Sequence, residues 1–390
     1  MGINFTDQQF TGNINSGRVA SLFEKTISLK ENYILFIATK TLIYQRKFSM
    51  QNEQLPDFVN FLLKPNAYDP VSEAVNLVQT HISYVFITDA FAYKFKKPVD
   101  FGFLDFSTPA KRHQYCQQEL ILNRRLCPSI YLDLVALEKT DGNFRLVNQA
   151  NADMDKTVEF GVKMKRMPEE RMMANVIRSG ELTAEMLDAI CDVLVPFYAK
   201  AEGGTAIQEF GRPDAVSVNI FENFSQTETF IGSKSLSKSQ FELIKNFSVQ
   251  FLQQDDLFAE RISADRIRDC HGDLYSANIC LADRIYIFDC IEFNERFRYC
   301  DVASDIAFLA MDLDFHGLSD LSEKFVNRFM QQSADNSLKN MLNFYKCYRA
   351  YVRGKINLFT ASAPEVDMPT KQRCQEMAGK YFLLAEQYAA

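Results

Sequence analysis

The stretch that most constrains the fold of this chain is CHGDLYSANICLADRIYIFDCIEF, which runs from Cys270 to Phe293. Its two apolar runs, NICL and IYIF, predict the two strands of a short hairpin. Polar residues stand at the ends of these runs: Asp273 precedes the first, Asn278 begins it, and Asp289 ends the second. One interpretation is a solvent-facing hairpin with an Asx turn. The other is a site in which carboxylate and amide oxygens hold a cation.

The spacing within this stretch favours the second interpretation. His271, Asp273 and Asn278 fit the pattern H-x-D-x-x-x-x-N, which is typical of loops that catalyse phosphoryl transfer. In that chemistry a carboxylate accepts the proton of the attacking hydroxyl, and Asp273 is the candidate. Asn278 and Asp289 would supply oxygen ligands for Mg²⁺, which neutralises charge on phosphates. We expect His271 to be a buried residue that braces the loop by hydrogen bonds.

A second pattern lies far upstream, in a run that predicts a strand. Ala92-Tyr93-Lys94 matches the A-x-K pattern of a strand lysine that contacts phosphates. Glu119, inside the helix that follows, is the expected ion-pair partner of Lys94. Period-two alternation places Lys96 on the same face, which makes it the alternative phosphate-binding lysine. Both lysines could instead be solvated residues at the edge of a sheet.

Three other patterns are not assigned to the site. Asp100-Phe101-Gly102 spells the metal-binding tripeptide of protein kinases, but it precedes the catalytic pattern instead of following it. Gly12–Arg18 has the spacing of a P-loop but lacks the Lys-Ser/Thr that contacts phosphate and Mg²⁺. Four of the nine cysteines stand at regular intervals from Cys270 to Cys300, a spacing that is not a zinc pattern. We expect reduced thiols.

The order of the predicted elements gives a strand-rich part followed by a helix-rich part. Hairpins are expected around Thr88–Ala90 and around Asp141-Gly142, and the Ser-Thr-Pro motif at 107–109 predicts a helix start. After a strand that ends near Pro168, helical spacing dominates. The glycine- and proline-containing stretch Glu202–Ser217 reads as a linker.

Composition narrows the class of function. The chain has 390 residues, of which 47% are hydrophobic and 24% charged, and its formal net charge is −7. These shares are ordinary for a soluble globular protein, and the acidic balance argues against a nucleic-acid binder. The run YILFIA, residues 33–38, is shorter than the ~20 residues that cross a membrane, and no signal peptide is visible. We therefore expect a cytoplasmic protein with a small-molecule substrate and no nucleic-acid or membrane partner; a protein partner is left open.

Four blocks of the sequence together resemble the aminoglycoside phosphotransferase-like family, within the protein-kinase-like superfamily: HGDLYSANI, IFDCIEFNERFRYCDVASDIAFLAMDLDF, KFKKPVDFGFLDFST and YKCYRAYVRGK. The resemblance is to a poorly characterised bacterial branch and extends from about Leu55 into the C-terminal region. It implies an α+β, two-lobed protein-kinase-like fold with a small strand-rich N-lobe and a larger helical C-lobe. The expected division is an N-terminal extension (1–54), an ATP-binding N-lobe (55–167) and a C-lobe (168–390).

The resemblance also implies roles for individual residues. ATP would lie in the cleft between the lobes, with Lys94 and Glu119 at its phosphates. Asp273 would be the catalytic aspartate, and Asn278 and Asp289 would bind Mg²⁺. The expected activity is an ATP- and Mg²⁺-dependent transfer of the γ-phosphate to a hydroxyl of a small molecule.

Two further expectations concern the adenine and the acceptor. Strand order places backbone groups of residues 163–166 at the adenine. Six carboxylates that follow the metal motif could attract a cationic acceptor, although helix starts and solvated faces explain most of them better; a sugar-like acceptor is also consistent. The six are Glu292, Glu295, Asp301, Asp305, Asp312 and Asp314.

Two alternative functions remain open at this point. Asp89 occupies the hairpin turn where relatives tend to carry glycine, and a carboxylate there would oppose phosphate binding. All motif residues are present, which favours catalysis, but Asp89 keeps open the alternative of a nucleotide-binding, pseudokinase-like regulatory module without transfer activity. A protein kinase is less favoured, because no A-P-E segment follows Asp289.

The segment before Leu55 carries no recognisable motif. We expect residues 1–49 to be dispensable and Met50 to be the true start. The apolar run YILFIA argues the other way, because it could add a strand to a sheet edge. A chain that begins at Met50 distinguishes the two: if it melts several degrees lower, the segment belongs to the fold.

Overall fold

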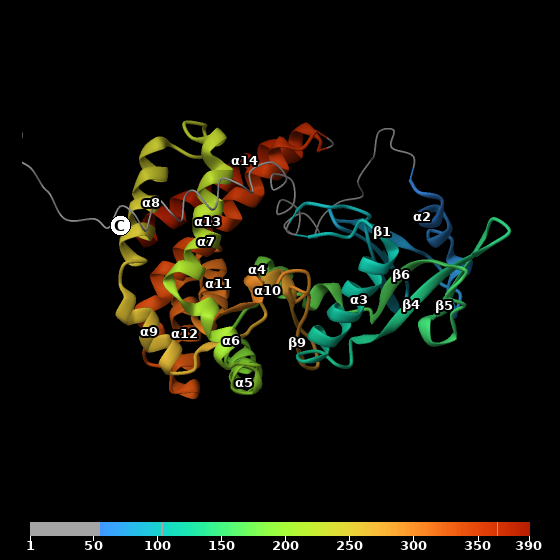
Figure 1. Ribbon diagram of the computed structural model, residues 1–390, viewed down its shortest axis with the longest axis horizontal. Coiled ribbons are helices and arrows are strands. Elements are labelled where there is room, and N and C mark those ends of the chain that lie inside the picture. Colours follow the sequence, from blue (N-terminus) through green and yellow to red (C-terminus); the bar gives the residue numbers. More distant parts are fainter. Residues whose placement is uncertain (1–54, 103, 365) are drawn as a thin grey trace, which may run out of the picture.

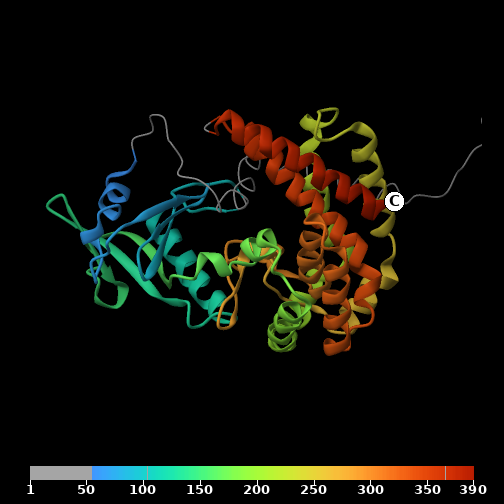
Figure 2. The same ribbon diagram turned by 180° about the vertical axis from the view of Figure 1, so that it is seen from behind.

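The computed structural model describes residues 55–102, 104–364 and 366–390. A strand-rich lobe and a larger helical lobe stand side by side, with α4 (Met173–Ser179) and β9 (Ile285–Ile287) lying between them (Figures 1 and 2). The α+β class expected from the sequence is confirmed. The expectations for Gly12–Arg18 and for a start at Met50 lie outside the described residues.

Six antiparallel strands form the sheet of the strand-rich lobe, in the order β1-β2-β3-β6-β4-β5. Along β3, Tyr93 and Phe95 are buried on one face, and Lys94 and Lys96 project from the other. Because β3 pairs with β2 on one side and β6 on the other, both lysines lie inside the sheet, and the edge interpretation is wrong. The strands are β1 (Asn76–Gln79), β2 (Ser83–Ile87), β3 (Phe91–Lys96), β4 (Tyr131–Thr140), β5 (Asn143–Asn148) and β6 (Thr157–Lys165).

One helix packs on each face of this sheet. The short α2 (Asp57–Leu62) packs onto the aromatic face of β3. The longer α3 (Pro109–Arg124) lies on the opposite face, against β4 and β6. It begins as the sequence predicts, with Pro109 in the first turn and the Thr108 side chain accepting a hydrogen bond from the third helical N–H. This start places Glu119 on the buried side of α3, facing the lysines of β3.

Both predicted hairpins of the lobe are confirmed. Thr88–Ala90 connects β2 to β3, and Asp141-Gly142 connects β4 to β5. Asp141 and Gly142 both have positive φ, at 48° and 83°, as a two-residue hairpin turn of this kind requires. The first strand, β1, has only four residues and was not predicted. Its sequence, NLVQ, is too short to show a period.

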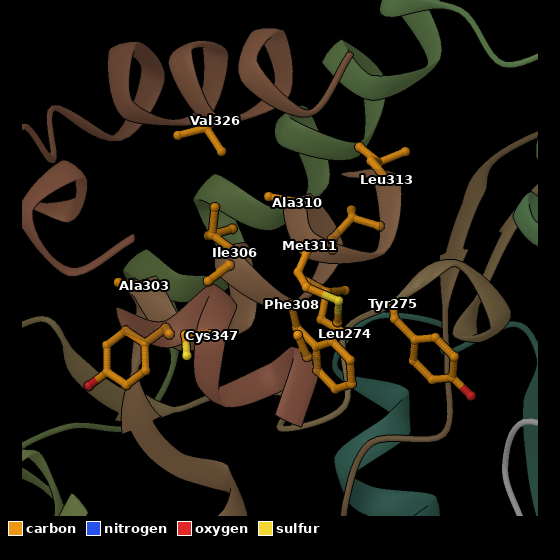
Figure 3. Packing of buried hydrophobic residues seen from close by; sticks show 14 of the residues in the cluster. Leu274, Tyr275, Ala303, Ile306, Phe308, Ala310, Met311, Leu313, Val326 and Cys347 are labelled. Carbon is orange, nitrogen blue, oxygen red and sulfur yellow. The ribbon is translucent and has the colours of Figure 1, made fainter. Parts of the chain in front are cut away.

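Helices α4 to α14 and two pairs of short strands build the helical lobe. Its core surrounds α11, whose side chains are buried along nearly its whole length and pack against α12 and α13 (Figure 3). Among the described residues, no helix is both long and apolar enough to cross a membrane. The elements are α4 (Met173–Ser179), α5 (Ala184–Lys200), α6 (Thr205–Gln208), α7 (Pro213–Thr227), α8 (Lys238–Phe251), α9 (Asp255–Ser263), β7 (Ile267–Asp269), β8 (Ile279–Leu281), β9 (Ile285–Ile287), α10 (Glu295–Arg298), β10 (Tyr299–Asp301), α11 (Val302–Phe315), α12 (Ser319–Ser333), α13 (Leu338–Ser362) and α14 (Met368–Ala389).

The linker expected at Glu202–Ser217 is partly wrong. The stretch contains α6 and the start of α7. Pro213 stands in the first turn of α7, where a missing N–H does no harm, so the proline starts a helix here instead of ending one.

The connection between the lobes is fastened to the β8–β9 hairpin. Met172, just before α4, forms a β-bridge with Cys280 of β8. The Arg171 Nε donates a hydrogen bond to the Leu281 carbonyl at 2.7 Å. The hairpin that carries Asn278 and Asp289 at its ends is therefore held at the junction of the two lobes.

Candidate active site

The loop before β8 is shaped by one glycine. Gly272 has φ +83°, a conformation that disfavours other residues. A Cβ at this position would also lie 2.7 Å from the Phe297 carbonyl oxygen. Both constraints explain why glycine separates His271 from Asp273.

A buried carboxylate from α11 anchors the same loop. Asp305 is fully buried and accepts hydrogen bonds from the backbone N–H groups of His271, at 2.7 Å, and Gly272, at 3.0 Å. The Tyr198 hydroxyl donates a third hydrogen bond to it at 3.0 Å. Arg349, whose Nη2 lies 3.7 Å from Asp305 Oδ1, donates to the Gly272 carbonyl at 3.0 Å. Asp305 therefore fixes the backbone next to Asp273.

We expect Asp305→Asn to destabilise the protein by about 2–4 kcal/mol, because a buried carboxylate that serves three donors is replaced by an amide that turns an NH₂ group toward some of them. Urea unfolding measures the loss. Asp155→Asn, at an exposed carboxylate, is the matched control and should lie within about 0.5 kcal/mol of wild type. Equal stability of the two variants would show that Asp305 does not anchor the loop.

His271 braces the loop as expected from the sequence. Its ring is buried, Nε2 donates to the Phe288 carbonyl at 3.0 Å, and Nδ1 accepts from the Asp273 N–H at 3.3 Å. The imidazole thereby links the loop of Asp273 to the residue that precedes Asp289.

Asp273 and Asn278 are in direct contact. The Asn278 side-chain NH₂ donates to the Asp273 backbone carbonyl and to Asp273 Oδ2, both at 2.9 Å. Asp273 is half-buried, whereas its neighbours Gly272 and Leu274 are buried. These two hydrogen bonds fix the orientation of the amide, whose remaining polar atom is an oxygen that can serve a cation.

Asp289 follows β9 in an unusual backbone conformation. Its φ is +63°, in the left-handed region that residues with a Cβ avoid and that Asp and Asn tolerate best. Its N–H donates to the Tyr131 hydroxyl at 3.3 Å. The next N–H, that of Cys290, donates to Asn123 of α3 at 2.9 Å. The strand-rich lobe thus holds the backbone that aims Asp289.

Lys94 forms ion pairs with residues of both lobes. Its Nζ lies 2.8 Å from Glu119 Oε1 and 2.9 Å from Asp289 Oδ1, a residue 195 positions away in the sequence. The side chains of Lys94 and Asp289 are 13% and 16% exposed, so this end of the cluster is partly open. Burial alone would lower the pKa of Lys94, but Asp289 and then Glu119 raise it well above its usual value. Lys94 is therefore a cation at every physiological pH.

Lys96, the alternative lysine, binds the other oxygen of Glu119. Its Nζ lies 2.7 Å from Glu119 Oε2 and 2.5 Å from Glu292 Oε1. Burial would raise the pKa of Glu119, but Lys94 and Lys96 together lower it. Sequence reasoning expected Glu119 to pair with a β3 lysine but did not find that it pairs with two, or that Glu292 completes the set.

Asp89 forms hydrogen bonds with residues next to the turn that it occupies. Its Oδ2 accepts a hydrogen bond from the Glu73 N–H at 2.7 Å, and its N–H donates to the Ser72 hydroxyl at 3.2 Å. The Glu73 hydrogen bond is the main cause that lowers the pKa of Asp89. The carboxylate is thus committed to the segment that leads into β1.

Most of the carboxylates considered for a cationic acceptor have internal partners. Glu292 binds Lys96, Asp301 binds Arg261, Asp305 anchors the loop, Asp312 accepts from the Ser276 N–H, and Asp314 binds Lys346. Glu295 is exposed. The set therefore stabilises the helical lobe and offers little charge to a ligand.

Two other segments named in the sequence do not join the ion pairs of this cluster among the described residues. Asp100 accepts a hydrogen bond from the Gly102 N–H within an exposed bend, which agrees with its exclusion as a metal motif. Lys165 and Arg166, at the expected adenine-binding segment, line a hollow of about 440 Å³ together with Asp283 and Tyr286 of the β8–β9 hairpin. The adenine contact of residues 163–166 stays a prediction.

The oxygen donors suit a hard cation such as Mg²⁺. Asp289 offers a carboxylate and Asn278 an amide oxygen, and Mg²⁺ is commonly held by one or two such groups plus the phosphates of a nucleotide. Within the described ranges, no three or more His, Cys, Asp or Glu side chains form a metal site by themselves. A cation here would need oxygens from its nucleotide as well.

No protein-family model matches the chain. The chain is 32% identical over 295 residues to uncharacterized proteins of Mycobacterium tuberculosis and Mycobacterium bovis. The match covers 75% of this chain and 56% of those proteins, so the chain spans little more than half the length of these relatives.

Solved structures similar to this one include small-molecule kinases. An amicoumacin kinase in complex with AMP-PNP, Ca²⁺ and Ami gives a TM-score of 0.48 at 13% identity, covering 94% of this chain and 95% of its own. A microcompartment-associated aminopropanol kinase gives 0.47 at 12% identity, covering 85% and 97%. A choline/ethanolamine kinase family protein from Mesorhizobium loti gives 0.45 at 10% identity, covering 85% and 99%. An aminoglycoside phosphotransferase from Streptomyces rimosus gives 0.42 at 15% identity, covering 76% of this chain and 99% of its own.

Proposed function

We propose that this chain is a small-molecule phosphotransferase of the aminoglycoside phosphotransferase-like family, which moves the γ-phosphate of ATP to a hydroxyl group with the help of Mg²⁺. The observation that carries the proposal is the position of Lys94. A lysine of β3 contacts a glutamate of α3 and the aspartate that follows β9. A kinase that binds its nucleotide between two lobes requires this combination of residues.

Each residue of the cluster has a role in this reaction. Lys94 contacts the phosphates, and Glu119 holds Lys94 in place. Asn278 and Asp289 would hold Mg²⁺, which when bound neutralises charge on the phosphates. Lys96 is too deeply buried to reach a nucleotide, so we assign the phosphate contact to Lys94 alone.

Asp273 orients the acceptor hydroxyl and accepts its proton. The carboxylate is half-buried, so an acceptor can approach it, and Asn278 fixes one of its oxygens. The rigid loop beneath it, anchored by Asp305 and Arg349, supports a base whose position must be exact to within a fraction of an ångström.

The acceptor is a small molecule whose class is open. A cationic acceptor could be attracted only by carboxylates that lack internal partners. Ion pairs inside the protein already bind Glu292, Asp301 and Asp314, so these carboxylates do not favour a cationic acceptor. The kinases of similar structure act on amino alcohols and antibiotics by their names, and amino alcohols, amino sugars, sugars and nucleosides are the classes to be tried first.

The test is ATP turnover in the presence of Mg²⁺ against a panel of these four classes, together with calorimetry of Mg²⁺-ATP binding. We expect nucleotide binding without any acceptor and turnover with at least one class. Binding without turnover across a broad panel would favour the nucleotide-binding regulatory module. Absence of binding would refute both functions.

A further inference from the structure

A second buried lysine stands next to the proposed phosphate-binding one. Lys96 Nζ is enclosed by Glu119, Glu292 and the ring of Phe106, whose centroid is 4.8 Å away. The side chains of Lys96 and Glu119 are 0% exposed and that of Glu292 is 4% exposed. Such a lysine cannot meet a ligand, and the proposed mechanism does not use it.

Glu119 divides its two oxygens between the two lysines. Oε1 binds Lys94 and Oε2 binds Lys96. The rotation of its carboxylate is therefore set by Lys96 as much as by Lys94. A change at Lys96 would alter the direction in which Glu119 presents Oε1.

Two ion pairs cross from β3 to the segment after β9. Lys94–Asp289 is partly open to solvent, whereas Lys96–Glu292 is closed. Phosphates that draw Lys94 away from Asp289 would break the first pair. The second pair would remain, because no ligand reaches it.

The charges of the cluster depend on Lys96. Two lysines face three carboxylates, those of Glu119, Asp289 and Glu292. The Tyr131 hydroxyl and the Cys116 thiol also face the cluster, but burial raises the pKa of both groups, so neither carries a charge. Without Lys96, a single lysine would have to serve all three. Like charges at close range in a buried site cannot all remain ionised, so a carboxylate would take up a proton. Glu292 would lose its lysine partner and Glu119 would keep only Lys94, so Lys96 determines whether the carboxylates that it binds all stay charged.

We propose that Lys96 is a positioning residue of the phosphotransferase site. It keeps Glu119 ionised and oriented so that Lys94 stays aimed at the phosphates, and with Glu292 it holds the sheet on the Asp289 segment while Lys94 exchanges Asp289 for a nucleotide. The proposal rests on the proposed function, in that it assigns a second layer of residues to the same site.

The first test needs no nucleotide and uses Lys96→Met, which keeps the apolar stem. In wild type the pKa of Glu119 is lowered, so Glu119 is ionised from about pH 5 to about pH 8. In the variant we expect this pKa to rise above its unfolded value of about 4.3. A carboxylate that is protonated only in the folded state destabilises the fold increasingly as pH rises toward its folded pKa.

The measurement is the melting temperature of Lys96→Met relative to wild type across this pH range. The deficit should widen as pH rises. In Lys96→Met/Glu292→Gln one competing carboxylate is removed, Lys94 remains for Glu119, and the deficit should be the same at every pH. In Lys96→Met/Glu119→Gln the deficit should also be independent of pH; a deficit that still widens as pH rises would assign the proton to Glu292 and overturn the claim for Glu119. Lys139→Met, at an exposed lysine of the same sheet whose Nζ lies 5.1 Å from the centre of the Phe144 ring, should show only a small deficit that does not change with pH.

The second test measures the positioning itself, by calorimetry with Mg²⁺ and a non-hydrolysable ATP analogue. We expect Lys96→Met to bind about tenfold or more weakly near pH 6, with a smaller loss near pH 8 where Glu119 regains its charge; outer residues that orient a ligand group commonly have effects of this size. Each dissociation constant is compared with that of wild type at the same pH, so that protonation of the ATP analogue itself affects both values equally.

The outcomes are distinguishable. A deficit that is independent of pH, or an unchanged affinity for the analogue, would reduce Lys96 to a structural residue and overturn the proposal. A wild-type protein that fails to bind the analogue would instead refute the phosphotransferase assignment, while the melting series still decides whether Lys96 controls the charge of Glu119.

Discussion

Asp273→Asn is expected to lower the rate of phosphoryl transfer by about 10²–10⁴-fold, because a positioned base that accepts the hydroxyl proton is replaced by a group that cannot accept it. The amide can still accept the hydrogen bond that Asn278 donates to Asp273 Oδ2, so the loop should keep its shape. Lys94 and Asp289 are unchanged, and nucleotide affinity should therefore stay close to that of wild type. Turnover with the acceptor found by the panel, and calorimetry with Mg²⁺-ATP, measure the two effects.

Asp155→Asn is the control for this change. Asp155 is an exposed carboxylate outside the cluster, and its replacement should leave turnover unaltered. Near-normal turnover of Asp273→Asn would show that another group accepts the proton. A loss of nucleotide affinity equal to the loss of rate would show that Asp273 serves binding instead of the chemical step.

Asp289→Ala is expected to weaken Mg²⁺-nucleotide binding by at least about tenfold, or about 1.4 kcal/mol, because a carboxylate ligand of the cation is lost. Lys94 loses one of its two partners in the same change. Alanine at φ +63° adds about 1–2 kcal/mol of backbone strain, so the melting temperature should fall as well.

Asp289→Asn separates these two causes. Asparagine tolerates the left-handed conformation, so it should retain the melting temperature and still weaken the binding of the metal-nucleotide complex, because the ligand charge is gone. If both variants keep the wild-type dissociation constant, Asp289 orders the backbone and does not bind the metal.

Residues linked by a local period could be predicted from the sequence. The two-residue period of β3 placed Lys94 and Lys96 on one face, and the lysine–glutamate pattern of kinases named Glu119 as the partner of Lys94. The motif spacing also placed Asp273 and Asn278 in one loop, where they are in contact. The strand face and the loop follow from local geometry, whereas the pairing of strand with helix follows from the motif.

Contacts that depend on packing between distant segments could not be predicted. Glu292 and Asp305 were considered as acids that attract a substrate, but Glu292 is bound by Lys96 and Asp305 by backbone N–H groups of the loop. Neither sequence position carries a local pattern for its partner. One signal was present for Asp305: it stands in the apolar run VASDIAFLA, and a carboxylate in a buried helix requires polar partners.

The hydrogen bonds of His271 keep the distance between Asp273 and Asp289 constant if the two lobes move relative to each other. It joins the Asp273 loop to the carbonyl just before Asp289, and all three residues belong to the helical lobe. Their mutual spacing is therefore a property of one rigid body. Separation of the lobes would break the Lys94–Asp289 ion pair and the hydrogen bonds that Tyr131 and Asn123 accept, but would carry Asp273 and Asp289 together. An open molecule would keep the acceptor and metal side assembled, and closure would need to restore the contacts of β3, β4 and α3.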